Sequence, residues 1–166
     1  MDCNMTSTRR TLLIRIIPGA MALSFLPLEI AHAETFEVSR SDAAWQKLLT
    51  PAAFDVLRRA GTEAPWSSSL ETEHRKGTYV CAGCALALFS SDTKFESGTG
   101  WPSFYRPLPN AVRTTVDRSW LIEVRTEVHC RRCGGHLGHV FDDGPKPTGL
   151  RYCMNGVAMK FSPVMA

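Results

Sequence analysis

Two short cysteine motifs carry the most specific chemical information in this sequence. Cys81 is followed three positions later by Cys84, and Cys130 by Cys133, and glycine lies inside or directly after each pair. Glycine at these positions favours tight turns. Two such turns can bring four thiolates to one tetrahedral Zn²⁺ that has no open coordination position. The spacing therefore predicts a structural zinc site.

Two other interpretations of these four cysteines are open from the sequence. In an oxidising compartment the same residues would form two disulfides. A Cys-x-x-Cys pair also serves as a redox centre in proteins of the thioredoxin type, where it accompanies a βαβ pattern. Neither motif opens a helix in such a pattern here, and zinc is the interpretation that we carry forward.

Cys153 is left over once the four paired cysteines are assigned. Arg151 lies two residues before it and Asn155 two residues after it, and the sequence holds two histidines nearby, His136 and His139. The thiolate is the nucleophilic form of cysteine, and neighbouring cations or protonated histidines increase its population. Cys153 is therefore a candidate nucleophile, with a buried, unreactive cysteine as the alternative.

Trp101 is the second unusual residue outside the cysteine motifs. Gly98 and Gly100 precede it and Pro102 follows it, so the backbone around the indole is tightly constrained. A tryptophan held in this way either packs in the core or forms one wall of a pocket. Both possibilities are open from the sequence.

The elements that must position these residues begin with two helices. The segment Ser41–Asp42 is expected to cap a helix over Ala43–Leu49. The pair Thr50–Pro51 has the pattern of a cap followed by proline at the first helical position. This second helix is expected to end at Gly61.

From Gly77 onward the pattern changes to short apolar or aromatic stretches separated by Gly, Pro, Asn and Asp. This pattern is typical of short antiparallel strands joined by irregular loops. The expected strands are Thr78–Val80, Ala87–Phe89, Trp120–Val124, His139–Phe141 and Val157–Phe161. We expect a mainly β domain with helices at its N-terminus.

The N-terminal segment is expected to direct export. Arg9 and Arg10 precede an apolar run over Thr11–Ile30, and Ala31–Ala33 has the small-x-small pattern that signal peptidase recognises. We expect a signal peptide over 1–33, of the twin-arginine type rather than the general one, and a periplasmic protein. The alternative is a membrane anchor, although the run is short and broken by proline.

Residues 34–40 are expected to form a linker and residues 41–166 a single domain. Hydrophobic residues make up 44% of the chain and charged residues 21%, which is ordinary for a globular protein. The net charge is only +3, and no run of Lys or Arg suggests binding to nucleic acid. No membrane contact is expected after removal of the signal.

Taken together, these segments resemble the MsrB family of methionine sulfoxide reductases over roughly residues 41–163. The resemblance rests on five motifs in the right order, and their specificity lies in the combination. They are the two cysteine pairs, Gly98–Phe104 (GTGWPSF), His136–Phe141 (HLGHVF) and Arg151–Asn155 (RYCMN), with Gly61–Trp66 in addition. The resemblance implies two small antiparallel sheets, the MsrB/Mss4-like β-tent, with N-terminal helices and one structural Zn²⁺.

The resemblance also implies a role for each candidate residue. Cys153 would attack the sulfur of a methionine (R)-S-oxide, in peptides, proteins or the free amino acid, and become a sulfenic acid. Trp101 would pack against the S-methyl group, while His139, supported by Asn155, would hold and protonate the sulfoxide oxygen. Two secondary polar members complete the predicted site: His136 and Asp143.

One position departs from the family pattern. Many members carry a second, resolving cysteine where this sequence has Thr99. We therefore expect an external thiol or a thioredoxin-like partner to reduce the Cys153 sulfenic acid. Two rival functions are a non-enzymatic module of the zinc-ribbon type and a thiol–disulfide oxidoreductase that acts through a Cys-x-x-Cys pair.

Overall fold

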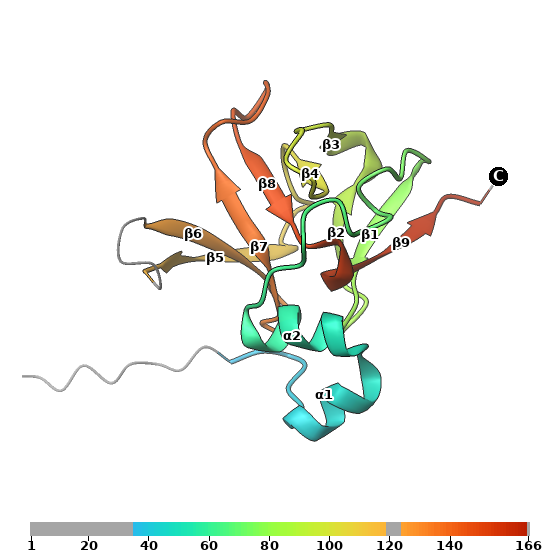
Figure 1. Ribbon diagram of the computed structural model, residues 1–166, viewed down its shortest axis with the longest axis vertical. Helices are drawn as coiled ribbons and strands as arrows, with labels where there is room; N and C mark the ends of the chain where they lie inside the picture. Colours follow the sequence, from blue (N-terminus) through green and yellow to red (C-terminus); the bar gives the residue numbers. More distant parts are fainter. Residues whose placement is uncertain (1–34, 119–123, 166) are drawn as a thin grey trace, which may run out of the picture. The chain divides into compact units, whose positions relative to one another are not determined.

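The computed structural model describes residues 35–118 and 124–165, and the predicted signal peptide lies outside these ranges. The described residues form two antiparallel sheets, which Figure 1 shows together with two N-terminal helices. The strand order is β2-β1-β9 in the three-stranded sheet and β3-β4-β8-β7-β6-β5 in the six-stranded sheet. The prediction of a mainly β fold with two antiparallel sheets and N-terminal helices is confirmed.

The bounds of the elements are as follows. The helices are α1 (Asp42–Leu48) and α2 (Pro51–Arg59), with short 3₁₀ helices η1 (Ser91–Thr93) and η2 (Gly156–Ala158). The three-stranded sheet contains β1 (Gly77–Cys81), β2 (Ala87–Ser90) and β9 (Met159–Pro163). The six-stranded sheet contains β3 (Lys94–Phe95), β4 (Ser103–Phe104), β5 (Val112–Asp117), β6 (Arg125–Cys130), β7 (His136–Phe141) and β8 (Arg151–Met154).

Both predicted helix caps are confirmed; α2 begins at Pro51 as predicted, whereas α1 begins at Asp42 and ends at Leu48, each one residue before the prediction. The hydroxyl of Ser41 accepts a hydrogen bond from the amide of Ala44 at the start of α1, and that of Thr50 accepts one from Ala53 at the start of α2. These caps satisfy amides that have no partner within the helix. At the end of α2 the left-handed cap residue is Ala60, with φ of 54°, one residue before the glycine that was expected to end the helix.

The structure confirms three of the five predicted strands and corrects the start of a fourth. Thr78–Val80, Ala87–Phe89 and His139–Phe141 lie within β1, β2 and β7. The prediction for Val157–Phe161 was wrong in its first two residues, which belong to η2, and β9 begins only at Met159. The apolar side chains of this stretch fit a turn of 3₁₀ helix as well as a strand, so the pattern alone could not separate them.

The strand expected over Trp120–Val124 falls mostly on residues 119–123, which lie outside the described residues, and Val124 precedes β6 without being part of it. Among the described residues, no helix is long and apolar enough to span a bilayer.

An aromatic cluster joins the two sheets. Tyr79 of β1 and Phe89 of β2 face Phe104 of β4, and all three rings are fully buried. The ring of Phe104 is stacked on Phe89 at 4.4 Å between centroids and meets Tyr79 edge-on at 4.9 Å. Such contacts add to the free energy that burial of the rings contributes. The cluster fixes β4, and therefore its neighbour β8, against the three-stranded sheet.

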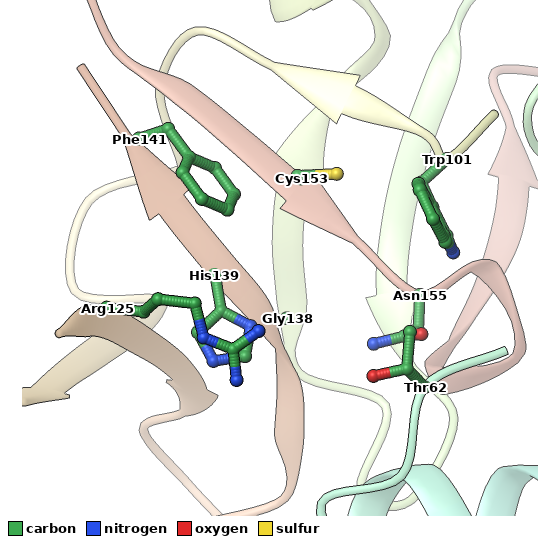
Figure 2. Close-up of a pocket in the computed structure, with 8 residues that line it drawn as sticks. All are labelled: Thr62, Trp101, Arg125, Gly138, His139, Phe141, Cys153 and Asn155. Atoms are coloured by element: carbon green, nitrogen blue, oxygen red, sulfur yellow. The ribbon is translucent and has the colours of Figure 1, made fainter. Parts of the chain in front are cut away.

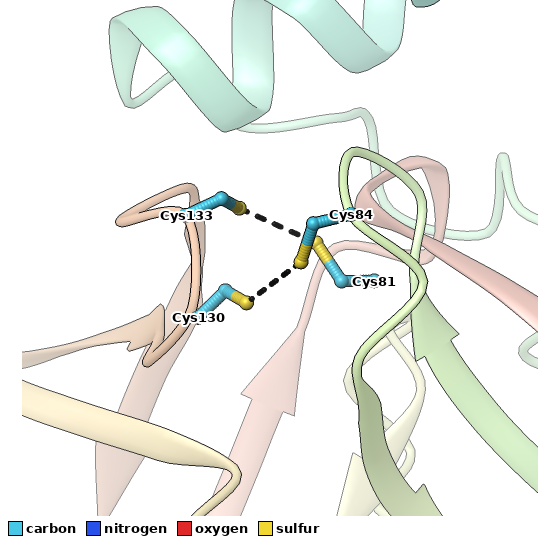
Figure 3. A group of neighbouring side chains, drawn as sticks. All are labelled: Cys81, Cys84, Cys130 and Cys133. Atoms are coloured by element: carbon cyan, nitrogen blue, oxygen red, sulfur yellow. Dashed lines mark hydrogen bonds between the residues drawn. The ribbon is translucent and has the colours of Figure 1, made fainter. Parts of the chain in front are cut away.

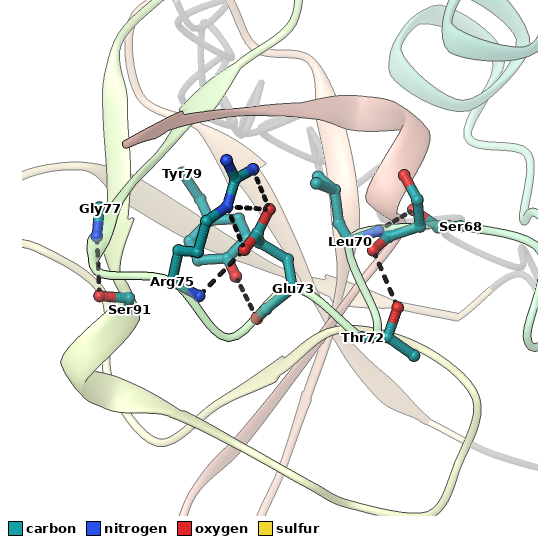
Figure 4. A network of polar contacts seen from close by, with 9 residues as sticks. Ser68, Leu70, Thr72, Glu73, Arg75, Gly77, Tyr79 and Ser91 are labelled. Carbon is teal, nitrogen blue, oxygen red and sulfur yellow. Dashed lines mark hydrogen bonds and ion pairs between the residues drawn. The ribbon is translucent and has the colours of Figure 1, made fainter. Parts of the chain in front are cut away.

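The chain between α2 and β1 runs without a helix or strand and is held by local hydrogen bonds. Arg75 bonds both carboxylate oxygens of Glu73, and the hydroxyl of Tyr79 donates to the carbonyl of Glu73, as Figure 4 shows. The amide of Gly77 donates to the hydroxyl of Ser91 at 3.0 Å. These contacts hold the C-terminal part of the connection.

Candidate active site and metal-binding cluster

Cys153 lines a cavity of about 180 Å³ together with Trp101, His139 and Asn155 (Figure 2). Four of the six predicted site residues therefore share one cavity. The remaining lining residues are Thr62, Arg125, Gly138 and Phe141. Cys153 is partly exposed, so the alternative of a fully buried cysteine does not describe it.

Strand register brings Cys153 and His139 together. Cys153 on β8 lies directly opposite His139 on β7. Residues opposite each other in an antiparallel pair have Cβ atoms about 4.5–5.5 Å apart and project from the same face. Gly138 permits a close approach here, because a Cβ at this position would lie 2.1 Å from the carbonyl oxygen of Cys153. The backbone itself therefore places an imidazole beside the thiol.

A chain of hydroxyl groups approaches the sulfur of Cys153 from the other side. The hydroxyl oxygen of Thr99 lies 3.8 Å from this sulfur. It is also 2.8 Å from the hydroxyl oxygen of Ser97, which lies 2.8 Å from the hydroxyl oxygen of Ser103. Ser103 is buried on β4, directly opposite Cys153. A thiolate at Cys153 can accept a hydrogen bond from Thr99.

Trp101 forms a wall of the cavity and is not part of the core. Its indole nitrogen donates to the carbonyl of Glu63 at 3.1 Å, which fixes the orientation of the ring. Gly100 before it has φ of 86°, a conformation that favours glycine, and its carbonyl accepts a hydrogen bond from the amide of Trp66. Of the two roles that the sequence left open, the structure shows the pocket wall.

Asn155 is buried, and both ends of its amide are bonded to the backbone. The side-chain oxygen accepts from the amide of Glu63 at 2.9 Å, and the nitrogen donates to the carbonyl of Leu137 at 3.1 Å. Asn155 thus connects the segment after α2 with β7. In this arrangement it holds the walls of the pocket together.

Glu63 is a residue that the sequence analysis did not select. Its carboxylate accepts hydrogen bonds from the amides of Gly156 and Val157 at the start of η2, while its backbone bonds Asn155 and Trp101. Burial raises the pKa of Glu63, and these two amide bonds partly oppose the rise. Its partners lie about 40 and 90 residues away, so no local spacing could have pointed to it.

His139 is held by an acidic residue that the sequence analysis also missed. Its Nε2 lies 2.9 Å from Oδ2 of Asp117, and Nη2 of Arg125 lies 2.8 Å from the same oxygen. Burial lowers the pKa of His139, and the hydrogen bond to Asp117 opposes this effect. The carboxylate therefore favours the protonated imidazole at the cavity.

The other two predicted site residues do not line the cavity. His136 is buried with its Nδ1 2.7 Å from a carboxylate oxygen of Glu127, and its ring meets that of His139 edge-on at 5.4 Å. Asp143 is 59% exposed and makes two hydrogen bonds to Arg151. These bonds raise the pKa of Arg151, with a smaller contribution from Cys153. Asp143 thus acts on the site only through Arg151.

The four paired cysteines form a single cluster at the junction of the two sheets. Cys81 ends β1 and Cys84 lies in the turn that follows it, while Cys130 ends β6 and Cys133 lies in the turn before β7 (Figure 3). All four sulfurs lie within 4.8 Å of one another. The cluster therefore connects the three-stranded sheet with the six-stranded one.

The distances in the cluster fit a metal ion and not disulfides. The sulfur of Cys84 lies 3.5 Å from that of Cys130, and the sulfur of Cys81 lies 3.7 Å from that of Cys133. Four sulfurs about 2.3 Å from a tetrahedral ion would be about 3.8 Å apart, whereas a disulfide needs about 2.05 Å. The sulfurs share hydrogen bonds, which lower the pKa of Cys84 and Cys130 and raise that of Cys81 and Cys133. The four cysteines can bind a metal ion.

Comparison with known proteins agrees with the site geometry. The SelR domain family matches residues 49–163. "Peptide methionine sulfoxide reductase MsrB" of Leptospira interrogans is 54% identical over 126 residues, covering 76% of this chain and 96% of its own.

Two further relatives show the same similarity across distant organisms. The protein of the same name from Methanosarcina barkeri is 55% identical over 75% of this chain and 87% of its own. "Peptide methionine sulfoxide reductase B1, chloroplastic" of Arabidopsis thaliana is 43% identical over 96% of this chain and 80% of its own. The chain therefore belongs to the MsrB family of peptide methionine sulfoxide reductases, which are oxidoreductases with a SelR domain.

Proposed function

We propose that this protein reduces methionine (R)-S-oxide, in peptides and proteins and as the free amino acid, to methionine, with Cys153 as the nucleophile. The observation that carries the proposal is the cavity in which Cys153 lies with Trp101 and beside His139. Membership of the MsrB family supports the same chemistry.

The first half-reaction consumes the thiol of Cys153. A sulfoxide sulfur is a poor electrophile until its oxygen is hydrogen-bonded or protonated, and His139 is the proton donor at this cavity. The Cys153 thiolate attacks the sulfur of the protonated sulfoxide, so that an S–S bond forms and the S–O bond breaks with release of the oxygen as water or hydroxide. Water then attacks the Cys153 sulfur and breaks the S–S bond, which leaves Cys153 as a sulfenic acid. Methionine leaves as the reduced thioether, and Cys153 has supplied the two electrons.

The arrangement of the cavity supports the proposed selection of one epimer. The Trp101 indole is fixed by its bond to Glu63 and provides an apolar wall for the S-methyl group. His139 and Cys153 occupy the neighbouring strands. With the methyl group against Trp101 and the oxygen toward His139, only one configuration at sulfur presents its reactive side to Cys153.

The second half-reaction requires a thiol from outside the described site. Among the described residues, the other four cysteines lie in the metal-binding cluster. A first external thiol attacks the sulfenic acid, releases water and forms a mixed disulfide, and a second thiol then restores Cys153. A thioredoxin-like dithiol supplies both.

We propose Zn²⁺ as the ion of the cysteine cluster, because four thiolates in tetrahedral spacing and without an open position favour a structural zinc site. We also propose that residues 1–33 are a twin-arginine signal and that the mature protein is periplasmic, which the pattern Arg9–Ala33 supports. Metal analysis of the purified protein and cell fractionation test these two points.

Turnover of the separate R and S epimers of a blocked methionine sulfoxide tests the main proposal. The wild-type protein is expected to reduce the R epimer, and Cys153→Ser is expected to lose this activity while it unfolds at the same temperature. Glu73→Gln removes a carboxylate that is paired with Arg75 and does not line the cavity, and it serves as a control that is expected to keep full activity. R-epimer turnover by Cys153→Ser would refute the proposal.

A further inference from the structure

One oxygen atom of Asp117 accepts two hydrogen bonds from residues of the cavity wall. Oδ2 lies 2.9 Å from Nε2 of His139 and 2.8 Å from Nη2 of Arg125. Both His139 and Arg125 line the cavity with Cys153, whereas Asp117 does not. The carboxylate therefore contacts the site from behind, without contacting the space where a substrate would bind.

The sheet brings these three residues together from three adjacent strands. Asp117 is the last residue of β5 and lies directly opposite Arg125, the first residue of β6. His139 is on β7, the next strand toward Cys153 on β8. The side chains of Asp117, His139 and Arg125 are only 16%, 13% and 23% exposed. Partial burial reduces solvent screening, so the interactions among these groups are stronger than on an open surface.

We propose that Asp117 is a positioning residue of the reductase reaction, which holds the imidazole of His139 in the orientation and protonation state that proton donation to the substrate oxygen requires. This inference rests on the function proposed above, because it assigns Asp117 a part in the step that His139 performs.

The hydrogen bond fixes the tautomer of His139. A carboxylate can only accept, so Nε2 carries a proton when it bonds Asp117. Protonation of the ring then adds a proton at Nδ1, and both nitrogens become donors. A carboxylate that orients a histidine and stabilises its protonated form is a recurring device in enzymes.

The charges around His139 shift its pKa in opposite directions. Asp117 of β5 favours the imidazolium, while Arg125 of β6 and His136 of β7 disfavour it, as does burial. Glu127 of β6 also lies opposite His139 but is hydrogen-bonded to His136. Cys153 of β8, as a thiolate, favours the imidazolium. Because Asp117 and Arg125 oppose each other, replacing each of them should move the pKa of His139 in opposite directions.

The experiment measures the first half-reaction alone, as the burst of methionine formed per Cys153 in the absence of a reductant. Its rate constant should fall as the pH rises through the pKa of His139, because the protonated ring is the donor. Asp117→Asn keeps an acceptor oxygen but removes the charge, and should shift this fall to lower pH by about one unit. Arg125→Gln should shift it to higher pH.

Titration of the His139 ring by ¹H–¹⁵N NMR provides a readout independent of activity. The same opposite shifts are expected, and Asp117→Glu should restore most of the wild-type value. Glu73→Gln removes a carboxylate that is paired with Arg75 and does not line the cavity, and should leave both the burst profile and the titration unchanged.

Each outcome decides the inference. The inference is overturned if Asp117→Asn has the burst profile and the His139 titration of the wild type. It is also overturned if Asp117→Asn and Arg125→Gln shift the pKa of His139 in the same direction, because that would indicate only a shared effect on packing. The proposed function fails separately, if Cys153→Ser still produces the burst.

Discussion

The hydroxyl oxygen of Thr99 lies 3.8 Å from the sulfur of Cys153. By the resemblance described above, Thr99 takes the place of the resolving cysteine that many family members carry, so a hydroxyl group stands here instead of a thiol. A side chain at position 99 therefore lies close to the Cys153 sulfur, but it carries no second sulfur. This relationship explains why the proposed reaction needs an external thiol after methionine has been released.

Replacing Thr99→Cys should restore an internal resolving step. The new sulfur would lie near the Thr99 oxygen and could attack the Cys153 sulfenic acid, with release of water. We expect an intramolecular disulfide after one turnover without reductant, detected as a loss of two thiols and of 2 Da by mass spectrometry. Thr99→Ser is the matched control and should form none. A sulfenic acid that persists in Thr99→Cys would contradict the expectation.

Replacing Trp101 should lower the catalytic efficiency toward the substrate more than it lowers the stability of the fold. Trp101→Ala removes the wall for the S-methyl group, and we expect kcat/KM for the R epimer to fall at least about tenfold, which corresponds to about 1.4 kcal/mol of lost transition-state stabilisation. Trp101→Phe keeps an aromatic wall but loses the hydrogen bond to Glu63, so its kcat/KM for the R epimer should fall less than that of Trp101→Ala. Equal activity of Trp101→Ala and the wild type would exclude a role for this wall.

Removal of the metal should destabilise the whole domain because the cysteine cluster joins the two sheets. Cys84→Ser removes the partly exposed ligand of the cluster. We expect this variant to purify without the ion and to unfold at a markedly lower temperature, since the free energy of binding at structural thiolate sites is coupled to folding. One equivalent of metal in Cys84→Ser, with unchanged thermal unfolding, would show that the cluster does not hold an ion.

Glu63 should make stability depend on pH in a defined direction. Burial raises the pKa of Glu63 in the folded protein above its ordinary value of 4.5. As the pH rises past 4.5, the unfolded chain loses this proton first, so the folded state binds more protons and stability falls until Glu63 ionises in the folded state too. This contribution is thus fully present at low pH and is lost as the pH rises through the folded-state pKa.

Glu63→Gln does not titrate and isolates this effect. The free energy of unfolding of the wild type minus that of Glu63→Gln should decrease as the pH rises above about 4.5 and then become constant. Urea unfolding at several pH values measures it, with the exposed Glu37→Gln as a control. A difference that increases with pH would show that the two amide bonds outweigh the burial of the carboxylate.

Asp143 should matter little, although the family pattern suggested it as a secondary member of the site. It lies outside the cavity, is 59% exposed, and reaches Cys153 only through Arg151. We expect Asp143→Asn to lower kcat/KM by no more than a few fold, because an exposed ion pair contributes little. A loss comparable to that of His139→Asn would place Asp143 in the chemistry after all.

Local features of this protein could be predicted from its sequence because their physical causes are local. Ser41 and Thr50 cap helices through amides three residues away, and each cysteine pair sits on its own turn. Hydrophobic patterns likewise identified β1, β2 and β7. Short motifs with a fixed order were also sufficient to indicate the family and to select Cys153 among the cysteines.

The tertiary structure alone decided which distant side chains meet. Strand register places His139 opposite Cys153, and the order of the strands brings Asp117 to His139. The chain after α2 brings Glu63 to Trp101, and Asp143 proves to lie outside the cavity. Such contacts depend on the packing of two sheets around a shared aromatic cluster and a shared cysteine cluster. Because this packing joins residues that are far apart in the sequence, local sequence patterns could not predict it.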